Sequence, residues 1–240
     1  MLLNIDLKGT EWVAVNWFAQ DPIGCKEIRD GADQHSINQE RFGLPNRTVA
    51  KVFVFRLIYG GTSFSYIHDP NFNWVSSSPR YWQRVIDSFY SKYEGIAKQH
   101  VAWMNEAIAT SRLTMPTGRI YFFLPYRRPD GSLKWPRTKI LNYPVQGLGH
   151  DLTTIARVSL YKRLQKQGGI DRGIKFISTV HDSIVLDLPH ELLDFVRPIV
   201  TGVFDDLPVN FNKLFGVEFN LPIKFELSIG VNLRDLTESS

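Results

Sequence analysis

Arg47-Thr-Val-Ala-Lys51-Val-Phe-Val-Phe55-Arg-Leu-Ile-Tyr59-Gly60 carries a cation or an aromatic residue at every fourth position. Asn46 before this stretch and Gly60-Gly61 at its end are typical of helix termini, so the sequence predicts a helix over 47–58. Residues four apart stack on one face of a helix, so two cations and two aromatics share one stripe. A triphosphate can lie on the cationic end of this stripe while a base packs on the aromatic end. The alternative is a solvated helix face beside ordinary core aromatics.

The composition is that of a folded protein with one large domain or two small ones, since 43% of the 240 residues are hydrophobic. The net charge of +4 is compatible with a polyanionic partner but does not require one. The single cysteine, Cys25, excludes an internal disulfide framework and fits a reducing compartment. The first residues do not resemble a signal peptide, and no stretch approaches the ~20 apolar residues of a membrane span. We expect a soluble protein of the cytoplasm (that of a host cell if the chain is encoded by a phage), with no membrane partner.

The pattern of apolar residues predicts strands at both ends of the chain with helices between them. The first half reads as a strand over 2–6, a helix over 11–20, a loop, a polar helix over 33–41, the 47–58 helix and a long helical region over 78–110. The second half reads as a hairpin that pairs 118–124 with 133–135, a helix over 145–166, strands over 174–180 and 184–188, a helix over 192–204 and a strand over 222–227. Val101 and Val158 are expected on inward helix faces. The fold class is therefore α+β, an antiparallel sheet that carries a helical excursion.

Two carboxylates stand where strands end. Asp6 closes the first strand, and Asp182 lies at the tip of the turn between two apolar strands. Two acids projecting from one sheet can hold two divalent cations about 4 Å apart, the arrangement used for nucleotidyl transfer. The alternative is that both are ordinary turn residues.

Other polar residues have two interpretations each. His35, on the polar helix, is a surface histidine unless that helix packs beside Arg47, in which case it can contact phosphate. The stretch 126–139 interleaves cations with aromatics and either follows a nucleic-acid backbone or is a solvated hairpin. Asn142 and Gln146 either read a minor-groove edge or cap the following helix.

Three signatures, in order, resemble those of family A DNA polymerases, especially the phage branch. Motif A is matched by Asp6-Leu-Lys-Gly-Thr-Glu11, motif B by the 47–60 stretch with Asp33-Gln-His35 before it, and motif C by Val180-His-Asp-Ser183. Gly118-Arg119, Asn142-Tyr-Pro-Val-Gln146-Gly147 and Gly230-Val-Asn-Leu233 match as well. The resemblance covers nearly the whole chain, and the ordered combination is more specific than any one motif. It implies a polymerase palm over 1–20 and 116–240 and a helical fingers subdomain over 21–115.

The resemblance implies a role for each matched residue. Asp6 and Asp182 would hold two Mg²⁺ ions, with the Leu7 carbonyl as a further ligand. The incoming dNTP would be bound by His35, Arg47, Lys51 and Phe55, and Lys51 would also be the acid for pyrophosphate departure. Glu11 would exclude a ribose 2′-hydroxyl. Tyr59 would stack near the template base, and the primer–template would be contacted by Arg119, Asn142, Gln146 and His181.

The chain departs from the family pattern at several positions. Ser183 stands where cellular members usually have Glu, Arg56 where motif B usually has Gly, and Thr138 where an Arg usually precedes Asn142. Motif A begins almost at Met1, so the thumb and any exonuclease are expected to lie outside this chain. The resemblance therefore implies either a fragment or half of a split polymerase with an upstream partner chain.

Two other functions compete with DNA synthesis. A phage-type RNA polymerase shares the His-Asp-Ser turn and the Arg/Lys/Tyr-Gly helix. Glu11 argues against it, since a small residue should stand there to admit a 2′-hydroxyl. Phe55 also argues against it, since the RNA enzymes usually have Met at that position. The third candidate is a non-catalytic nucleic-acid-binding subunit, against which the complete sets of acids and cations weigh.

Overall fold

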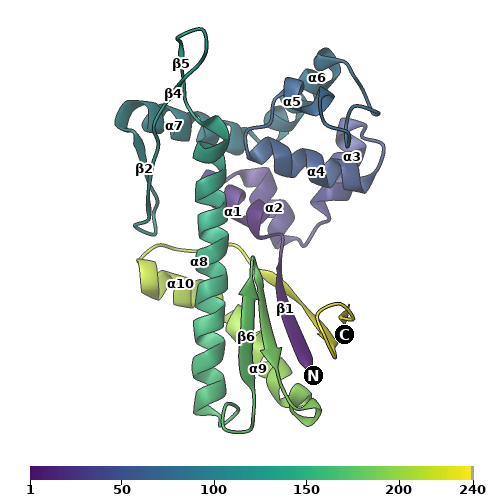
Figure 1. The fold of residues 1–240 in the computed structure, drawn as a ribbon, viewed down its shortest axis with the longest axis vertical. Coiled ribbons are helices and arrows are strands. Elements are labelled where there is room, and N and C mark those ends of the chain that lie inside the picture. Colours follow the sequence, from purple (N-terminus) through teal and green to yellow (C-terminus); the bar gives the residue numbers. More distant parts are fainter. Residues whose placement is uncertain (239–240) are drawn as a thin grey trace. The chain divides into compact units, whose positions relative to one another are not determined.

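A computed structural model describes residues 1–238, which separate into two compact units. Unit 1 consists of Met1–Thr10 and the chain from Gly147 onward, and unit 2 is Glu11–Gln146. Figure 1 shows the elements of both units. The mixture of helices with an antiparallel sheet is the one predicted. In the described part of the chain, no helix is long and apolar enough to cross a membrane.

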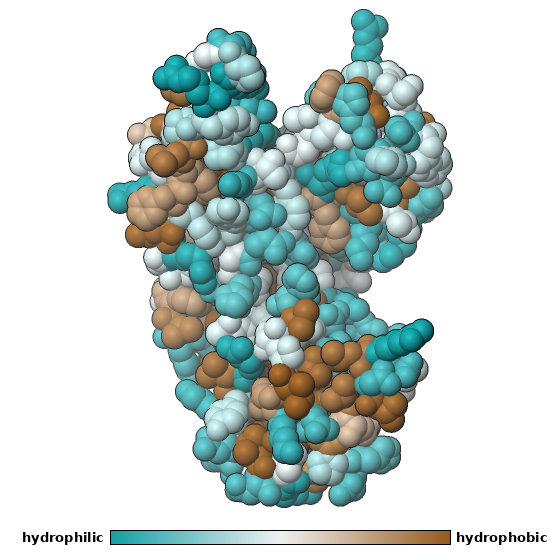
Figure 2. Space-filling view, in the orientation of Figure 1, coloured by the Kyte–Doolittle hydropathy of each residue, from teal (hydrophilic) through white to brown (hydrophobic). Residues whose placement is uncertain are grey.

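Unit 1 is built on an antiparallel sheet with the strand order β6-β7-β1-β8-β9. Its strands are β1 (Leu2–Lys8), β6 (Lys175–Val180), β7 (Ser183–Asp187), β8 (Lys224–Gly230) and β9 (Thr237–Glu238). In the central strand β1, burial alternates: Leu3, Ile5 and Leu7 are buried, while Asp6 lies on the opposite, partly exposed face. This period of two fixes which side chains face the core and which remain accessible. Figure 2 shows hydrophobic surface on this unit. Among its hydrophobic residues, Ile177 and Val180 of β6 are exposed.

Helices supply the rest of the unit 1 core. They are the part of α8 (Arg137–Lys166) from Gly147 onward, α9 (Leu193–Asp205) after the short 3₁₀ helix η1 (His190–Leu192), and α10 (Leu207–Phe215). Their inward residues are apolar, including Leu152, Leu164, Val196, Val200 and Phe211. Val158, expected to face inward, is 43% exposed.

The predicted start of α8 at residue 145 is wrong, because the helix begins at Arg137 and continues through Pro144. Proline removes one backbone hydrogen bond and usually breaks a helix. Here Ile140, Leu141 and Val145 are fully buried on both sides of it, so packing holds the helical path across the proline. Asn142 therefore does not cap the start of a helix, and that alternative is excluded.

Unit 2 is mainly helical. It contains α1 (Thr10–Ala19, from its second residue), α2 (Pro22–Arg29), α3 (Gln34–Phe42), α4 (Arg47–Ile58), α5 (Ser63–Ile67), α6 (Pro79–Lys92), α7 (Glu94–Thr110) and the start of α8. The predicted bounds of α4 are confirmed, with Asn46 as the N-cap through its side-chain bond to the Val49 amide. The stretch 21–32, expected as a loop, contains α2.

The predicted helical region 78–110 consists of two helices, α6 and α7, and the break between them falls at Tyr93. The Tyr93 ring packs against Trp12 and Phe89, with centroids 5.0 and 4.9 Å away. Its hydroxyl oxygen lies 2.8 Å from Glu27 Oε2 and 2.9 Å from Asn38 Oδ1, so its single proton can be donated to either acceptor. These tertiary contacts hold Tyr93 outside a helical path. Val101, expected to face inward, is 59% exposed.

Two small hairpins replace the single hairpin predicted between 118–124 and 133–135. Strand β2 (Arg112–Thr114) pairs with β3 (Ile120–Phe122), and β4 (Tyr126–Arg127) pairs with β5 (Leu133–Lys134). The prediction missed β2. This strand has one buried side chain, Leu113, and a single apolar residue does not distinguish a strand from the end of α7.

Candidate active site

Asp6 and Asp182 lie beside each other in unit 1. Asp6 pairs in register with Ser183 of β7, and the neighbouring Leu7 amide donates to the Asp182 carbonyl at 3.0 Å. Both acids are half-buried. The sheet register thus brings the end of the first strand against the turn that carries the second acid, although 175 residues of chain separate them in the sequence.

The β6–β7 turn that presents Asp182 is tight. His181 has a φ of +54°, in the left-handed region that few non-glycine residues adopt. The Ser183 hydroxyl donates to the Val180 carbonyl at 2.9 Å, which closes the turn. Ser183, the departure from the family's Glu, is thus bound within the turn. His181 is exposed at its tip.

Three further side chains complete the surroundings of the acids, and sequence reasoning missed them. The Thr10 hydroxyl donates to Asp182 Oδ2 at 3.1 Å. Lys8 Nζ lies 3.2 Å from Asp6 Oδ2 and also forms an ion pair with Glu226. Glu226 lies on β8, directly opposite Asp6 in the sheet. The Glu226 contact raises the pKa of Lys8, and Lys8 in turn lowers the pKa of Glu226. The alternation of β1 places Lys8 on the face of Asp6, but nothing in the sequence indicates that Glu226 lies opposite.

The donor set formed by Asp6 and Asp182 fits Mg²⁺. Carboxylate oxygens are the hard ligands this ion prefers, and Mg²⁺ is commonly held by one or two carboxylates together with substrate phosphates. Among the described residues, no group of three or more His, Cys, Asp or Glu side chains is arranged to hold a metal ion. The two acids therefore suit an ion whose remaining ligands come from a bound substrate and water.

The stripe predicted on α4 lies on its accessible side. Arg47 and Lys51 are exposed, while Phe55 and Tyr59 are half-buried. The opposite side is buried through Phe53, Val54, Leu57 and Ile58, among others. The core is therefore supplied by other residues of the helix, and none of the four stripe residues is fully buried. Lys51 Nζ lies 5.9 Å from the centre of the Phe55 ring.

Helix α3 packs beside this stripe. Asp33 binds Arg47 with two hydrogen bonds of 2.7 and 3.2 Å, and the His35 ring meets the Phe55 ring edge-on at 5.6 Å. The arginine holds the pKa of the Asp33 carboxyl well below its ordinary value. The same carboxylate caps α3 by accepting from the His35 amide at 3.1 Å. The condition under which His35 becomes a candidate phosphate contact is met.

His35 is buried, and this burial lowers its pKa to about 4, with the nearby Arg47 adding to the effect. Its Nδ1 has no hydrogen-bond partner among the described residues. The imidazole is therefore neutral near pH 7. It can offer a ligand a hydrogen bond but no positive charge, which leaves the charge on this side of the site to Arg47 and Lys51.

The aromatic end of the stripe is joined to α8. Gln146 donates its side-chain amide to the Tyr59 hydroxyl. Asn142, one turn earlier on α8, is half-buried. Glu11 is half-buried in the first turn of α1, and Arg119 is exposed just before β3. The structure thus gathers His35, Arg47, Lys51, Phe55, Tyr59 and Gln146 in unit 2, and Asp6, Leu7 and Asp182 in unit 1.

Comparisons with known proteins agree on one family. The sequence model of DNA polymerase family A matches residues 1–235. The chain is 24% identical over 228 residues to a DNA polymerase of Bacillus phage SP01, covering 91% of this chain and 24% of that protein. It is 23% identical over 247 residues to DNA polymerase I of Lactococcus lactis subsp. lactis, covering 96% of this chain and 25% of the relative. The chain thus spans about a quarter of the length of these relatives.

The fold gives the same result. A solved structure, the POL domain of Pol1 from M. smegmatis in complex with DNA primer-template and dNTP, superposes with a TM-score of 0.75. The match covers 95% of this chain and 39% of that one at 14% identity, so it shows a shared fold. Because the family's sequence model extends over almost every residue and the fold is that of a polymerase domain, the chain belongs to DNA polymerase family A.

Proposed function

We propose that this chain carries the nucleotidyl-transfer centre of a template-directed DNA polymerase, in which a primer 3′-hydroxyl attacks the α-phosphate of a dNTP. The observation that carries the proposal is the pairing of β1 with the β6–β7 turn, which brings Asp6-Leu7 against Asp182-Ser183 through the backbone. Two adjacent half-buried acids on one sheet are what cation-assisted phosphoryl chemistry requires.

Asp6, Asp182 and the Leu7 carbonyl would hold two Mg²⁺ ions. When bound, these ions would lower the pKa of the primer hydroxyl and offset the charge on the phosphates. The side chains around the acids have separate tasks. Thr10 holds one oxygen of Asp182, which fixes the rotamer of that carboxylate. Lys8 bonds Asp6, and it must yield that carboxylate for a cation to bind there.

The α4 stripe is the proposed site of the incoming dNTP. Arg47 and Lys51 offer two exposed positive charges for the triphosphate, and neutral His35 adds a hydrogen bond. Phe55 would pack on the sugar and base, and Lys51 is the proposed acid for the departing pyrophosphate. In the induced-fit step we propose, α4 closes over a correctly paired nucleotide.

The remaining site residues would serve selection and DNA binding. Glu11 is the proposed barrier to a 2′-hydroxyl, and Tyr59 the proposed stacking partner of the template base. Gln146, Asn142, His181 and Arg119 would contact the primer–template. The proposed palm is 1–20 and 116–240 and the proposed fingers are 21–115, so the palm takes in all of unit 1 and both ends of unit 2.

In our proposal, the complete enzyme also contains a part that holds the DNA duplex. The relatives are about four times as long, and a thumb-bearing upstream chain, with or without a 3′–5′ exonuclease, is the proposed partner. The matched relatives are DNA polymerases, which does not favour the phage-type RNA polymerase. The non-catalytic subunit is disfavoured because nucleic-acid binding alone needs no adjacent acids.

Primer extension tests the proposal. A labelled primer–template is incubated with Mg²⁺ and either dNTPs or rNTPs, first with this chain and then with an upstream polymerase chain added. We expect extension with dNTPs, and its loss by at least about a thousandfold in Asp182→Asn, because a metal-holding carboxylate acts directly on the transition state. Asp171→Asn, an exposed acid of the same unit, is the matched control and should extend normally. Equal extension by Asp182→Asn and the unaltered chain would refute the acid assignment.

A further inference from the structure

Arg56 lies at the edge of the accessible side of α4, next to Phe55 in the sequence and three residues before Tyr59. Its side chain is 33% exposed, and that of its partner Asp69 is 11% exposed. Loss of Arg56 would leave the mostly buried Asp69 carboxylate without this partner, which costs more than the loss of an exposed surface pair.

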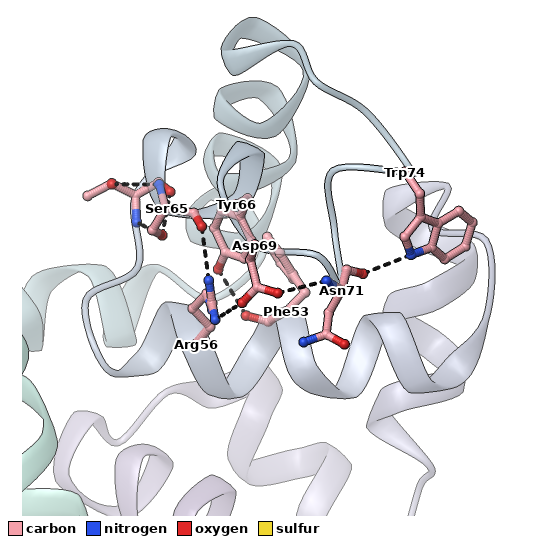
Figure 3. Close-up of polar contacts among 8 residues, drawn as sticks. Phe53, Arg56, Ser65, Tyr66, Asp69, Asn71 and Trp74 are labelled. Carbon is pink, nitrogen blue, oxygen red and sulfur yellow. Dashed lines mark hydrogen bonds and ion pairs between the residues drawn. The ribbon is translucent and has the colours of Figure 1, made fainter.

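The Arg56 guanidinium is bound from several directions (Figure 3). It forms the ion pair with the Asp69 carboxylate, and its other terminal nitrogen donates to the Ser65 carbonyl at 2.9 Å. It also lies over the rings of Phe72 and Tyr66, 5.3 and 5.9 Å from their centres. A planar fork with several donors can satisfy these contacts together, whereas lysine has one point charge and would satisfy fewer of them.

The contacts continue beyond Asp69 along the chain. Its second carboxylate oxygen accepts from the Asn71 amide at 2.7 Å, and the Trp74 indole donates to the Asn71 carbonyl at 3.1 Å. From the buried side, the Tyr66 hydroxyl donates to the Phe53 carbonyl of α4 at 3.0 Å. The segment 63–74 is therefore attached to α4 at two of its faces, by Arg56 outside and by Tyr66 inside.

The end of α4 is built into the same attachment. The Gly61 amide donates to the Arg56 carbonyl at 2.9 Å, so the chain turns back closely against Arg56 after the helix. A Cβ at Gly61 would lie 2.8 Å from that carbonyl oxygen, which explains glycine at this position. This turn directs the chain into α5, where the Ser65 carbonyl meets the guanidinium.

We propose that Arg56 is a positioning residue for nucleotide binding: it fixes the last turn of α4, and with it Phe55 and Tyr59, against the segment 63–74. Side chains held in their binding geometry before a ligand arrives give up less conformational freedom on binding. This inference rests on the proposed function, because it assumes that the α4 stripe receives the dNTP.

The test compares Arg56→Gln and Arg56→Lys with the unaltered chain. Arg84→Gln is the matched control, since Arg84 is exposed on α6 in the same unit. Hydrogen exchange of the amides in 59–74 measures how firmly this segment is held against α4. Titration calorimetry with dTTP and Mg²⁺ measures nucleotide binding at the α4 stripe, and primer is left out so that no reaction occurs.

We expect Arg56→Gln to speed exchange across 59–74 and to raise the dTTP dissociation constant about tenfold, with Arg56→Lys in between and Arg84→Gln unchanged. A residue needed merely for folding would lower the fraction of binding-competent protein without changing the dissociation constant of that fraction. Unchanged exchange in Arg56→Gln would overturn the attachment. Faster exchange with an unchanged dissociation constant would overturn the positioning role while the proposed function stands. Failure of the unaltered chain to bind dTTP would overturn the proposed function, and the positioning role with it.

Discussion

At the scale of single residues, the charge of the proposed triphosphate site is set by a pair of side chains from two helices. Arg47 is bound by both oxygens of Asp33, so a carboxylate already occupies the face of the guanidinium that a phosphate needs. Both side chains are about half exposed. An exposed pair of this kind contributes little to stability, on the order of 1 kcal/mol or less, and can exchange with an incoming anion.

Asp33→Asn isolates this competition, because asparagine is as good a helix N-cap as aspartate and keeps the shape of the side chain. We expect the dTTP dissociation constant to fall about two- to fivefold, with a steeper dependence on salt, since one competing negative charge is removed. Calorimetric titration at two salt concentrations measures the dissociation constant and its dependence on salt. Asp30→Asn, which removes an exposed acid paired with Lys26, is the control and should change neither. Weaker binding by Asp33→Asn would instead show that Asp33 orients Arg47 for the ligand.

At the scale of elements, α2 is positioned by one buried acid and one glycine. Asp21 caps α2 through the amides of Ile23 and Gly24, and its other oxygen accepts from the Gly95 amide of α7 at 2.8 Å. Gly24 lies directly against Asn16 of α1: a Cβ there would come within 1.8 Å of Asn16 Oδ1. The approach of α2 to α1 thus depends on a position without a side chain.

Gly24→Ala should therefore destabilise the protein by about 1–3 kcal/mol, the usual cost of overpacking a filled interior. Urea denaturation followed by circular dichroism gives the free energy of unfolding. Gly149→Ala is the matched control within a helix, since its Cβ would lie 3.8 Å from Thr10, an ordinary contact. That variant should be neutral or gain up to about 1 kcal/mol from helix propensity. Equal effects of the two substitutions would show that the Asn16 contact does not limit the packing.

At the scale of the whole molecule, stability should depend on pH through two buried histidines. Burial lowers the pKa of His35 to about 4 and that of His100 to about 3, against an ordinary value of 6.5. His100 bonds the Tyr90 hydroxyl at 3.1 Å through Nδ1, and its Nε2 has no partner among the described residues. Both rings are buried, so protonation of either would place a positive charge away from water.

Between pH 6.5 and about 4 the unfolded chain binds protons on these rings that the folded chain does not, so stability present above pH 6.5 is lost as the pH falls. Each histidine should contribute a loss of about 1 kcal/mol from pH 6.5 to 5.5, because the unfolded-state imidazole is already half protonated at pH 6.5. Thermal unfolding at pH 7.5, 6.5 and 5.5 measures this slope. His100→Gln should make the slope shallower, whereas His190→Gln, which alters an exposed residue, should leave it unchanged. An equal slope in all three proteins would exclude His100 as a cause.

The elements differ in how far the sequence predicts them, for identifiable reasons. Helix α4 was predicted to the residue because its N-cap and its glycine end act within a few positions of chain. The break at Tyr93 was missed because Glu27, Asn38 and Trp12, which hold it, come from other parts of the sequence. The predicted pairing of 118–124 with 133–135 was wrong because β3 pairs instead with the strand before it, a choice between partners of similar local pattern.

The candidate site follows the same division. The sequence motifs name six candidate site residues, whose roles stay predictions: Asp6, Asp182, Arg47, Lys51, Phe55 and Tyr59. The ordered motifs resemble those of the family to which the chain belongs. Three ion pairs were not predicted: Lys8 with Glu226, Arg47 with Asp33, and Arg56 with Asp69. Each of these pairs joins separate elements, and charged residues on a surface have many possible partners.

The sequence by itself determined the α+β class, the motifs and the bounds of helix α4, because these depend on periodicity, end residues and spacing within short stretches. Tertiary structure alone decided which groups meet: the contact of Asp182 with the first strand, the neutral state of buried His35, and the attachment of Arg56 to Asp69. Distances, burial and the energies of charges depend on segments brought together by packing, and a linear pattern does not encode those pairings.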